Sequence, residues 1–384
     1  MDLLENVVQP YAWGSFAAIA ELRGLPTPSE TPEAELWLGA HPAAPSISER
    51  GDRRPLGQRI AAAPEAELGA RVSRAFGELP FLLKILAART PLSLQAHPTL
   101  EQARAGFDAE EAAGVPRGAA HRNYKDRNHK PELICALGPF DALCGFRAVD
   151  ETRALFTELG TLAELSARLD ALPSAFGWLM RLPKAEQTAL VDATLAACRR
   201  VESPRFARER AWALRLGETY PGDVGVIGAL LLNLVRLEAG EAIYLPAGNL
   251  HAYLEGVGVE IMASSDNVLR GGLTPKHVDV AELLRVLDFH AGPVSKVLPV
   301  REGDLERWPT PAREFALARV VLESGRWSAP LDGPVIAICT EGVLRARDAH
   351  GERTLSRGVS VFVPADARQL ALEGTGTLFL AGVP

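Results

Sequence analysis

The sequence predicts a mainly β protein with a helical insertion near its middle. Residues 1–149 hold short apolar runs separated by Pro and Gly, which is typical of strands and turns. Residues 150–225 instead carry apolar residues at helical spacing between strong helix formers. A β pattern returns at about residue 226, and from about residue 291 the chain reads as short strands to its end. We therefore expect three domains: residues 1–149 with 226–290, residues 150–225, and residues 291–384.

Each region contains segments that support this division. In the first region, AELWLGA and FLLKILA predict strands, whereas LEQARAGFDAEEAAG, from Leu100 to about Gly118, has the composition of a helix. The insertion contains the helical segments DETRALFTELGTLAELSARLDAL, KAEQTALVDATLAACRRV and RFARERAWALRLGETY. Beyond it, IYLPAGNLHAYLEGVGVEIMA indicates strands, and HVDVAELLRVLDF, after Pro275, indicates one more helix.

Composition and charge exclude several classes of protein. The 384 residues are 47% apolar and 23% charged, a globular composition that is long enough for two or three domains. A net charge of -7 provides no broad basic surface for nucleic acid. We expect no secretory signal at the N-terminus, and no stretch reaches the roughly 18 apolar residues of a membrane helix. Four cysteines without a CxxC pair indicate reduced thiols. We therefore expect a cytoplasmic monomer without nucleic-acid or membrane partners.

An internal repeat links the second β region to the C-terminal region. GEAIYLPAGNLHAYLEGVGVEIMAS, from Gly240, aligns without a gap with GVSVFVPADARQLALEGTGTLFLAG, from Gly358, and 8 of 25 positions are identical. This predicts two copies of one β module. The polar side chains of the first copy are replaced in the second, where Gln369 stands opposite His251. We therefore expect the chemistry in the first copy and packing support from the second.

A row of polar side chains interrupts what otherwise reads as a core strand. Ser93, Gln95 and His97 in LSLQAHPTL are spaced two apart, so in an extended chain they share one face, and Leu94 and Ala96 share the other. Ligand-type side chains are also dense in NHKPELI, PAGNLHAYLEG and EIMASSDNVLRGGLTPKH. Imidazole, carboxylate and amide donors without a thiolate suit Zn, and also Mn, Fe or Co. The row therefore predicts a divalent metal site.

Long motifs give the chain a family resemblance. The spacing G-x5-P-x-G-x2-H, from Gly240 to His251, matches the second motif of the cupin family, a β-barrel that holds a metal in its mouth. The stretches PYAWGS, AELWLGAHP, PFLLKIL, PLSLQAHP, NYKDRNHKPE and LPAGNLHAYLEGVGVEIMASSDNVLRGGLTPKH resemble the type I phosphomannose isomerase family, in the family's order and up to about residue 290. The resemblance implies a cupin, or jelly-roll, catalytic domain, an α-helical domain and a second, degenerate jelly roll. It also implies a zinc enzyme that interconverts mannose 6-phosphate and fructose 6-phosphate, with Gln95, His97, Glu132 and His251 as zinc ligands.

The other residues of these motifs suit the isomerisation of a sugar phosphate. Moving a proton between adjacent carbons, through a cis-enediol, needs a base within hydrogen-bond reach, and the candidates are Glu260, Asp266 and Lys130. The phosphate needs positive charge, and Arg270 and Lys276 flank a Gly-Gly turn that lets backbone approach a ligand.

Further substrate contacts are expected around these residues. Lys84 stands alone in the apolar run PFLLKILA, and we expect it and Ser93 to reach the phosphate. The alternative for Lys84 is an edge lysine with its ammonium in water. Trp13 and Tyr253 are expected to line the sugar pocket.

Two other functions remain open for a metal-holding cupin. A non-catalytic sugar-binding or regulatory cupin needs neither a base nor a phosphate contact, so the presence of Lys130, Glu260, Arg270 and Lys276 argues against it. An iron-dependent oxidoreductase more often uses two His and a carboxylate with open positions, and the proposed Gln ligand argues against that function.

Overall fold

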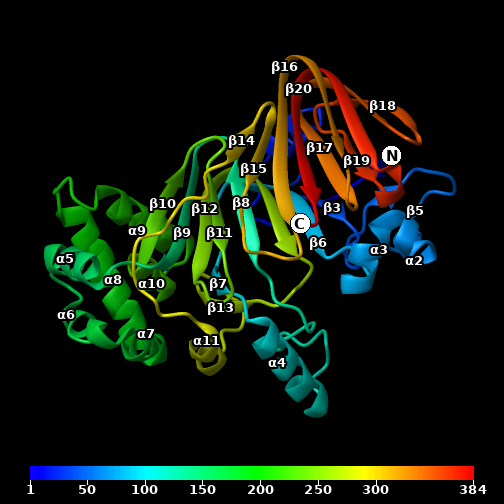
Figure 1. The fold of residues 1–384 in the computed structure, drawn as a ribbon. Helices are drawn as coiled ribbons and strands as arrows, with labels where there is room; N and C mark the ends of the chain where they lie inside the picture. The colour runs from blue at the N-terminus through cyan, green and yellow to red at the C-terminus, as the bar shows by residue number, and fades with distance from the viewer.

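Two ten-stranded sheets form the centre of the molecule (Figure 1). The computed structural model describes all of residues 1–384. The first sheet contains β2 (Val7–Gln9), β3 (Glu35–Gly39), β6 (Phe81–Ala88), β7 (Leu94–Ala96), β8 (Glu132–Ala136), β9 (Phe140–Phe146), β10 (Leu232–Leu237), β11 (Ala242–Leu245), β12 (His251–Ala263) and β13 (Leu269–Gly272). Its main order is β10–β9–β12–β6–β3–β2, with β7 and β8 also paired to β12, β11 to β8 and β13 to β7. The predicted mainly β fold is confirmed.

The second sheet is built from both ends of the chain. It contains β1 (Asp2–Glu5), β4 (Ile47–Ser48), β5 (Arg54–Pro55), β14 (Val300–Glu302), β15 (Leu305–Trp308), β16 (Ala316–Pro330), β17 (Val335–Asp348), β18 (Gly351–Ser356), β19 (Ser360–Val363) and β20 (Gln369–Gly382). Because β1 pairs antiparallel with β19, N-terminal residues complete the C-terminal sheet. The prediction of only short strands after residue 291 is wrong, since β16, β17 and β20 have 15, 14 and 14 residues.

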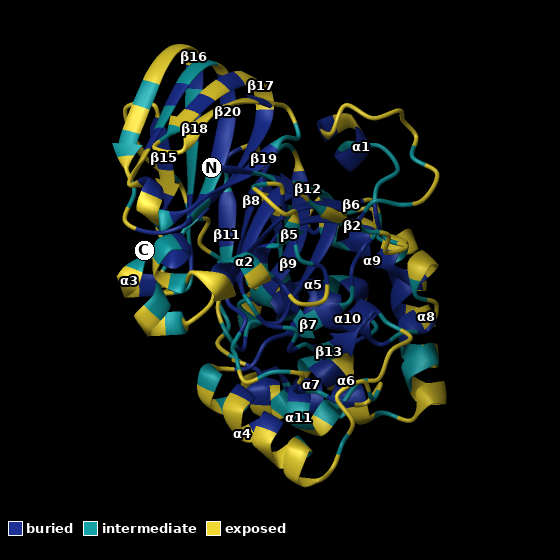
Figure 2. Ribbon diagram, turned by 90° about the vertical axis from the view of Figure 1, so that its right-hand side faces the viewer, coloured by how far each residue is buried: buried dark blue, intermediate teal, exposed yellow.

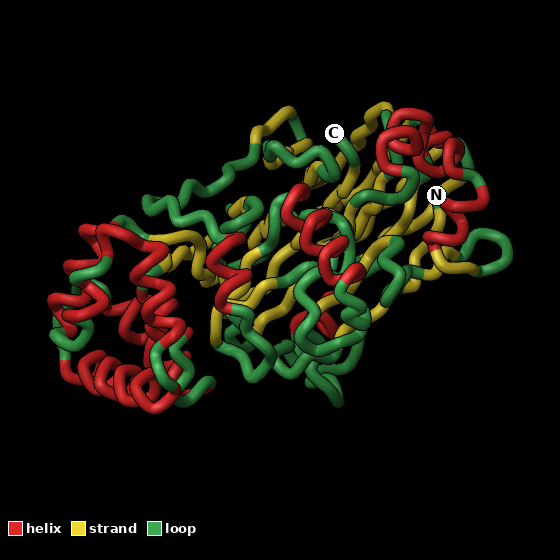
Figure 3. Tube along the Cα trace, turned by 90° about the horizontal axis from the view of Figure 1, so that it is seen from below, coloured by secondary structure: helices red, strands yellow, loops and turns green.

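The predicted helical insertion is confirmed and gathers at one end of the molecule (Figure 3). It consists of α5 (Val149–Leu159), α6 (Ala163–Ser166), a 3-10 turn (Leu169–Ala171), α7 (Leu172–Arg181), α8 (Lys184–Arg200), α9 (Ala207–Thr219) and α10 (Gly225–Leu230). The β pattern returns at Leu232 rather than at residue 226, because the apolar run VIGALL closes the insertion as α10. No helix in the molecule is both long enough and apolar enough to cross a membrane.

Five helices lie outside the insertion, and two of them follow the sequence prediction. These two are α4 (Leu100–Ala112), which Thr99 and Gln102 cap reciprocally, and α11 (Val280–Val286). The other three, α1 (Ala18–Leu22), α2 (Leu56–Ala62) and α3 (Pro64–Phe76), lie in the region predicted as strands and turns. In α3 the helical spacing of the apolar residues is interrupted at Gly69, where the helix kinks with φ of 78°.

The internal repeat corresponds to two structural copies. The sequence alignment places Ala242 opposite Ser360 and His251 opposite Gln369, and each of these four residues begins a strand. The strands β11 and β12 therefore correspond to β19 and β20, and a short 3-10 helix (Ala365–Ala367) lies between the latter two. The prediction of two β modules is confirmed.

The strand β12 holds the first sheet together. Its half from Gly256 to Ala263 pairs with β6 on one side and, from Gly258, with β8 on the other. Its first half pairs with β9 and, at His251, with β7. A bulge between Tyr253 and Glu255 separates the halves, so one strand carries polar side chains to two neighbouring places.

The polar row on β7 has the predicted alternation. Leu94 and Ala96 are fully buried in a core that includes Phe176 of the helical insertion. Gln95 faces a cleft on the other side of the strand. Figure 2 shows the strands around β12 as mostly buried, whereas helices such as α4 and α8 carry exposed residues on their outer sides. The helical insertion therefore covers the apolar face of β7 and leaves its polar face to the cleft.

Candidate active site and metal centre

A polar cleft of about 520 Å³ brings the predicted site residues together. This volume lies within the range of roughly 300–1,000 Å³ that is usual for small-molecule sites. Eleven of the predicted residues line the cleft: Trp13, Lys84, Ser93, Gln95, Lys130, Glu132, Tyr253, Glu260, Asp266, Arg270 and Lys276. The other two, His97 and His251, contact Glu132. A larger hollow of about 700 Å³ lies on the C-terminal sheet, where paired Arg and Glu side chains line it without any imidazole.

Two imidazoles converge on the carboxylate of Glu132. Nε2 of His97 lies 3.5 Å from one carboxylate oxygen, and Nε2 of His251 lies 3.2 Å from the other. All three side chains are almost fully buried. The two Nε2 atoms and Oε2 of Glu132 have no hydrogen-bond partner, which is costly for buried polar atoms. These three donor atoms therefore fit a divalent cation that completes their coordination.

The far side of each imidazole sets its tautomer. Nδ1 of His97 lies 2.7 Å from the carbonyl oxygen of Asn267, and Nδ1 of His251 lies 3.0 Å from that of Asn249. A carbonyl oxygen can only accept, so both Nδ1 atoms carry the proton and both Nε2 atoms keep a free lone pair. This is the arrangement that orients histidine ligands in metal sites.

The charges at this place favour metal binding. Burial lowers the pKa of His97 to about 4, so its imidazole is neutral at physiological pH. Burial alone would raise the pKa of Glu132, but nearby charges, above all the Lys130 ammonium 3.1 Å away, hold it well below its usual range. A neutral imidazole and an ionised carboxylate are the ligand forms that a cation requires.

Gln95 is a neighbour of His251 in the sheet and of Glu132 in the cleft lining. It pairs with His251 across the β7–β12 ladder and with Arg270 across the β7–β13 ladder. Its side chain lines the cleft beside Glu132. The amide oxygen can therefore join the two imidazoles and the carboxylate as an additional donor.

A second buried polar group centres on Lys84. Its ammonium lies 3.0 Å from Oε2 of Glu260 and 3.3 Å from Oε1 of Glu35. Tyr253 donates its hydroxyl to the other oxygen of Glu260, at 2.9 Å, and Trp37 donates its indole N–H to the other oxygen of Glu35, at 2.7 Å. The ammonium that was predicted to reach a phosphate is thus paired with two carboxylates.

The protonation states in this group follow from the pairing. Burial alone would lower the pKa of Lys84, but Glu260 and Glu35 outweigh it and raise that pKa above its ordinary value. Lys84 is therefore a permanent cation. Burial raises the pKa of Glu260 despite the neighbouring ammonium, which brings this carboxyl closer to neutral pH.

Three cations at the other side of the cleft have no carboxylate partner. They are Arg270, Lys276 and Lys125, and none of them forms an ion pair. Burial lowers the pKa of Arg270, and burial followed by the charges of Arg270 and Lys125 lowers that of Lys276. Unpaired cations that repel one another in a cleft provide a site for a doubly charged anion such as a phosphate.

Several cleft residues were missed or left without a role by the sequence reasoning. Lys125 and Tyr220 line the cleft, and Lys125 was detectable only as one more cation in the motif NYKDRNHKPE. Glu35 and His41 lie in the motif AELWLGAHP, which by itself indicates no chemical step. The structure pairs His41 with Asp266, 3.5 Å away, and burial lowers the pKa of His41.

Comparisons with known proteins are consistent over the whole chain. The family model "Phosphomannose isomerase type I, catalytic domain" matches residues 1–149. Mannose-6-phosphate isomerase of Salmonella typhimurium is 39% identical over 394 residues, or 98% of each chain, and that of Rattus norvegicus is 34% identical over 94% of this chain and 93% of its own. The crystal structure of the Salmonella typhimurium enzyme bound to substrate and a zinc atom has a TM-score of 0.92 and 38% identity, covering 100% of this chain and 99% of that one.

Proposed function

The chain belongs to the type I phosphomannose isomerase family, and we propose that it interconverts mannose 6-phosphate and fructose 6-phosphate with one zinc ion held by Gln95, His97, Glu132 and His251. The observation that carries this proposal is the pair of buried imidazole nitrogens that face one carboxylate without a hydrogen-bond partner. When bound, zinc supplies a Lewis acid beside the oxygens of the sugar.

The unpaired cations give the cleft its substrate class. We propose that Arg270, Lys276 and Lys125 bind the phosphate, because they lie in the cleft without carboxylate partners. Arg270 can hold two phosphate oxygens with its planar fork of donors. A sugar whose phosphate is fixed there has its other end free to reach the metal ligands. Ser93, Trp13 and Tyr253 line the same cleft, and we propose that they form the walls of the sugar site.

The reaction moves one proton between two neighbouring carbons. A base takes the proton from the carbon beside the carbonyl, the C–H electrons form the double bond of an enediolate, and the carbonyl π electrons move onto the carbonyl oxygen. A proton passes from the neighbouring hydroxyl to that oxygen, and the base returns its proton to the former carbonyl carbon, so that the carbonyl group moves to the neighbouring carbon. We propose Glu260 as this base, because its raised pKa suits proton transfer near neutral pH and because Lys84 and Tyr253 fix both of its oxygens. Lys130 is paired as an ammonium with Glu132 and is less suited to accept a proton.

Metal removal tests the proposed activity. Protein treated with a chelator should lose conversion of mannose 6-phosphate to fructose 6-phosphate and should regain it when zinc is added back. Mannose without phosphate, supplied to the same zinc-loaded protein, should react far more slowly, because it lacks the contacts to the three cations. Full activity in the metal-free protein would contradict the proposal, and zinc binding without any turnover would instead favour a non-catalytic cupin.

Two variants test the base. Glu260→Gln should lower kcat by roughly 100- to 10,000-fold because it removes the group that accepts the proton. It should keep the zinc affinity, because Glu260 is hydrogen-bonded to Lys84 and Tyr253 and not to a proposed zinc ligand. Asp266→Asn is the comparison, because Asp266 is half-exposed in the same cleft and pairs only with His41. A larger loss of kcat in Asp266→Asn than in Glu260→Gln would assign the base to Asp266.

We also propose that the enzyme acts as a monomer in the cytoplasm, on a small molecule alone. All four cysteines are free and buried, which suits a reducing compartment. Light scattering should give the mass of one chain, 41.2 kDa. A stable dimer at micromolar concentration would contradict this part of the proposal.

A further inference from the structure

Two loops beside the metal ligands are joined by side chains rather than by a strand ladder. One loop, Lys125–Asn128, precedes β8, and the other, Ser265–Asn267, follows β12. Asn267, the last residue of the second loop, is fully buried. Its side-chain oxygen accepts from the backbone N–H of Lys125 at 2.7 Å, and its side-chain nitrogen donates to the carbonyl oxygens of Asp126 at 2.8 Å and Asn128 at 2.9 Å.

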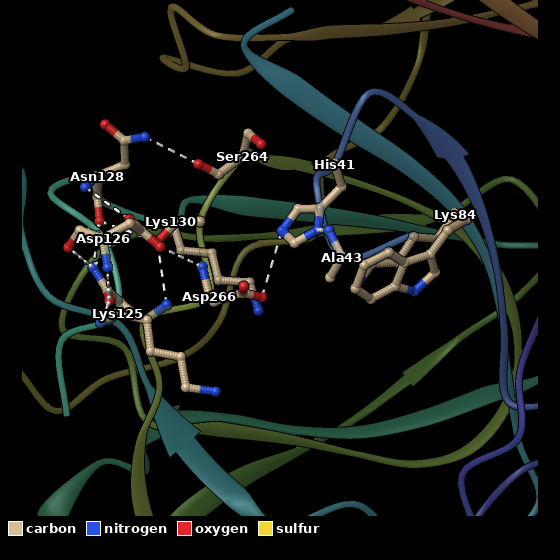
Figure 4. A network of polar contacts seen from close by, with 12 residues as sticks. His41, Ala43, Lys84, Lys125, Asp126, Asn128, Lys130, Ser264 and Asp266 are labelled. Carbon is tan, nitrogen blue, oxygen red and sulfur yellow. Dashed lines mark hydrogen bonds and ion pairs between the residues drawn. The ribbon is translucent and has the colours of Figure 1, made fainter. Parts of the chain in front are cut away.

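The carboxylate of Asp126, which belongs to the first loop, accepts hydrogen bonds from the second loop (Figure 4). One oxygen accepts from the Ser265 hydroxyl and from the backbone N–H of Asn128, both at 2.9 Å. The other oxygen accepts from the backbone N–H of Asp266, at 2.7 Å. The side chains of Asp126 and Asn267 thus bond to six backbone N–H and C=O groups in these two irregular segments. We call this network of Asp126, Asn267 and the groups they bind the loop clamp.

The loop clamp ends on three groups of the active site. The backbone carbonyl of Asn267 accepts from Nδ1 of His97 at 2.7 Å and so orients this imidazole. The backbone N–H of Asp266, bound by Asp126, lies next to the side chain that pairs with His41. The backbone N–H bound by the Asn267 side chain belongs to Lys125, one of the three unpaired cations. One small network therefore contacts one proposed metal ligand, His97, and holds the backbone of two cleft residues, Asp266 and Lys125.

We propose that Asp126 and Asn267 are positioning residues, which fix His97 for zinc and place Lys125 and Asp266 for the substrate. This inference rests on the proposed function of the site. Neither residue touches the metal or the substrate, so each acts through the groups it holds. Outer partners of histidine ligands commonly contribute about 10- to 100-fold to metal affinity or activity, because they restrict the imidazole to the binding orientation.

The variant Asp126→Asn tests the clamp with the smallest change in shape. An amide has a single acceptor oxygen, so it cannot accept from both the Asp266 N–H and the Ser265–Asn128 pair. We expect its zinc affinity to fall by about 10- to 100-fold, with a lower kcat and a higher KM for mannose 6-phosphate. Ser265→Ala removes one of the donors to this carboxylate and should give a smaller change in the same direction, even if Asp126→Asn does not fold.

A matched control separates positioning from stability. Asn6 does not line the cleft, and its amide bonds to the hydroxyl of the loop residue Ser46 and to that of Ser360 at the start of β19. Asn6→Ala should lower the melting temperature and leave zinc affinity, kcat and KM unchanged. Zinc affinity is measured by competition with a chromophoric chelator, without substrate.

The outcomes distinguish the clamp from the function itself. If Asp126→Asn and Ser265→Ala lower only the melting temperature, as Asn6→Ala does, the clamp is merely structural and the inference is overturned. If the parent protein binds no zinc and isomerises nothing, the proposed function fails first. Weaker zinc binding in the clamp variants, at melting temperatures no lower than that of Asn6→Ala, would support the inference.

Discussion

Replacing Lys84 with Met should destabilise the protein strongly at high pH and much less at low pH. Lys84→Met keeps the length of the side chain and removes its charge. The ammonium lies 3.0 Å from Glu260 and 3.3 Å from Glu35, and all three side chains are buried. At an effective dielectric constant of about 20, unit charges at 3.0 Å attract by about 5 kcal/mol. Breaking a buried pair of this kind typically costs about 3–5 kcal/mol, because a buried charge loses its partner.

The pH dependence follows from the carboxylates that remain. Burial already raises the pKa of Glu260, and loss of the ammonium raises it further. A group whose pKa is higher in the folded protein than in the unfolded chain loses stabilising free energy as pH rises through the folded value. In the variant, protonation at pH 5 relieves the unpaired charge, and ionisation at pH 8 restores it. We therefore expect the loss of unfolding free energy in Lys84→Met, relative to the parent protein, to be smaller at pH 5 than at pH 8 by roughly 1–3 kcal/mol, since each unit of pKa corresponds to about 1.4 kcal/mol.

Urea denaturation of the metal-free protein at pH 5 and pH 8 measures both effects. Lys296→Met is the matched control, because Lys296 pairs with Glu241 at the surface and should contribute about 1 kcal/mol or less at either pH. An unfolding free energy of Lys84→Met within about 1 kcal/mol of the parent at pH 8 would refute the reasoning. An equal deficit at both pH values would also refute it, since it would exclude a titrating carboxylate.

Three further substitutions test other parts of the molecule. His251→Ala should weaken zinc binding by roughly 100- to 1,000-fold, because it removes one of four ligands that together supply about 10–16 kcal/mol of binding free energy. Chelator competition measures the zinc affinity, and His350→Ala in the C-terminal module is the control. In steady-state kinetics, Arg270→Met should raise both the KM for mannose 6-phosphate and the Ki for inorganic phosphate by roughly 10- to 100-fold. Substitution of the exposed Arg326 by Met should change neither constant. An unchanged Ki in Arg270→Met would show that Arg270 does not bind the phosphate. Gly225→Ala should lower the stability in urea titrations by about 1–3 kcal/mol, because its new methyl group would lie 2.6 Å from a backbone nitrogen, and unchanged stability would mean that the neighbouring loop moves freely.

Part of the candidate metal centre was indicated by the sequence because a strand has a fixed period. Ser93, Gln95 and His97 stand two apart and alternate with the apolar Leu94 and Ala96, and this spacing predicts a polar face. The cupin spacing before His251 pointed to the same kind of site. The repeat of the two β modules was equally visible, because the two stretches align without a gap. Its glycines Gly256 and Gly374 occupy matching positions and both have positive φ, of 139° and 133°. Local patterns thus predict local features well.

Features that depend on register could not be predicted. Lys84 lies directly opposite Glu260 in the β6–β12 ladder and opposite Trp37 in the β3–β6 ladder, and no local pattern contains this pairing. The sequence therefore suggested a phosphate contact where the structure has a buried ion pair. The pairing of β1 with β19, across most of the chain, was missed for the same reason.

Loop positions were the other limit. Lys125 and the clamp residues Asp126 and Asn267 lie in irregular segments, where side-chain hydrogen bonds rather than periodicity fix the backbone. The sequence identified their motifs but assigned roles only to neighbours such as Lys130. Three helices near the N-terminus were missed: α1 has only 5 residues, and Gly57 in α2 and Pro64 and Gly69 in α3 interrupt the helical pattern.

A zinc soak of crystals of this protein, with an anomalous difference map at the zinc edge, tests the central proposal most directly. We predict one peak per chain, about 2.0–2.2 Å from Nε2 of His97, Nε2 of His251, an oxygen of Glu132 and the amide oxygen of Gln95. If the protein is fully active and its only zinc peak lies elsewhere, or out of reach of either imidazole, the proposed metal site is contradicted.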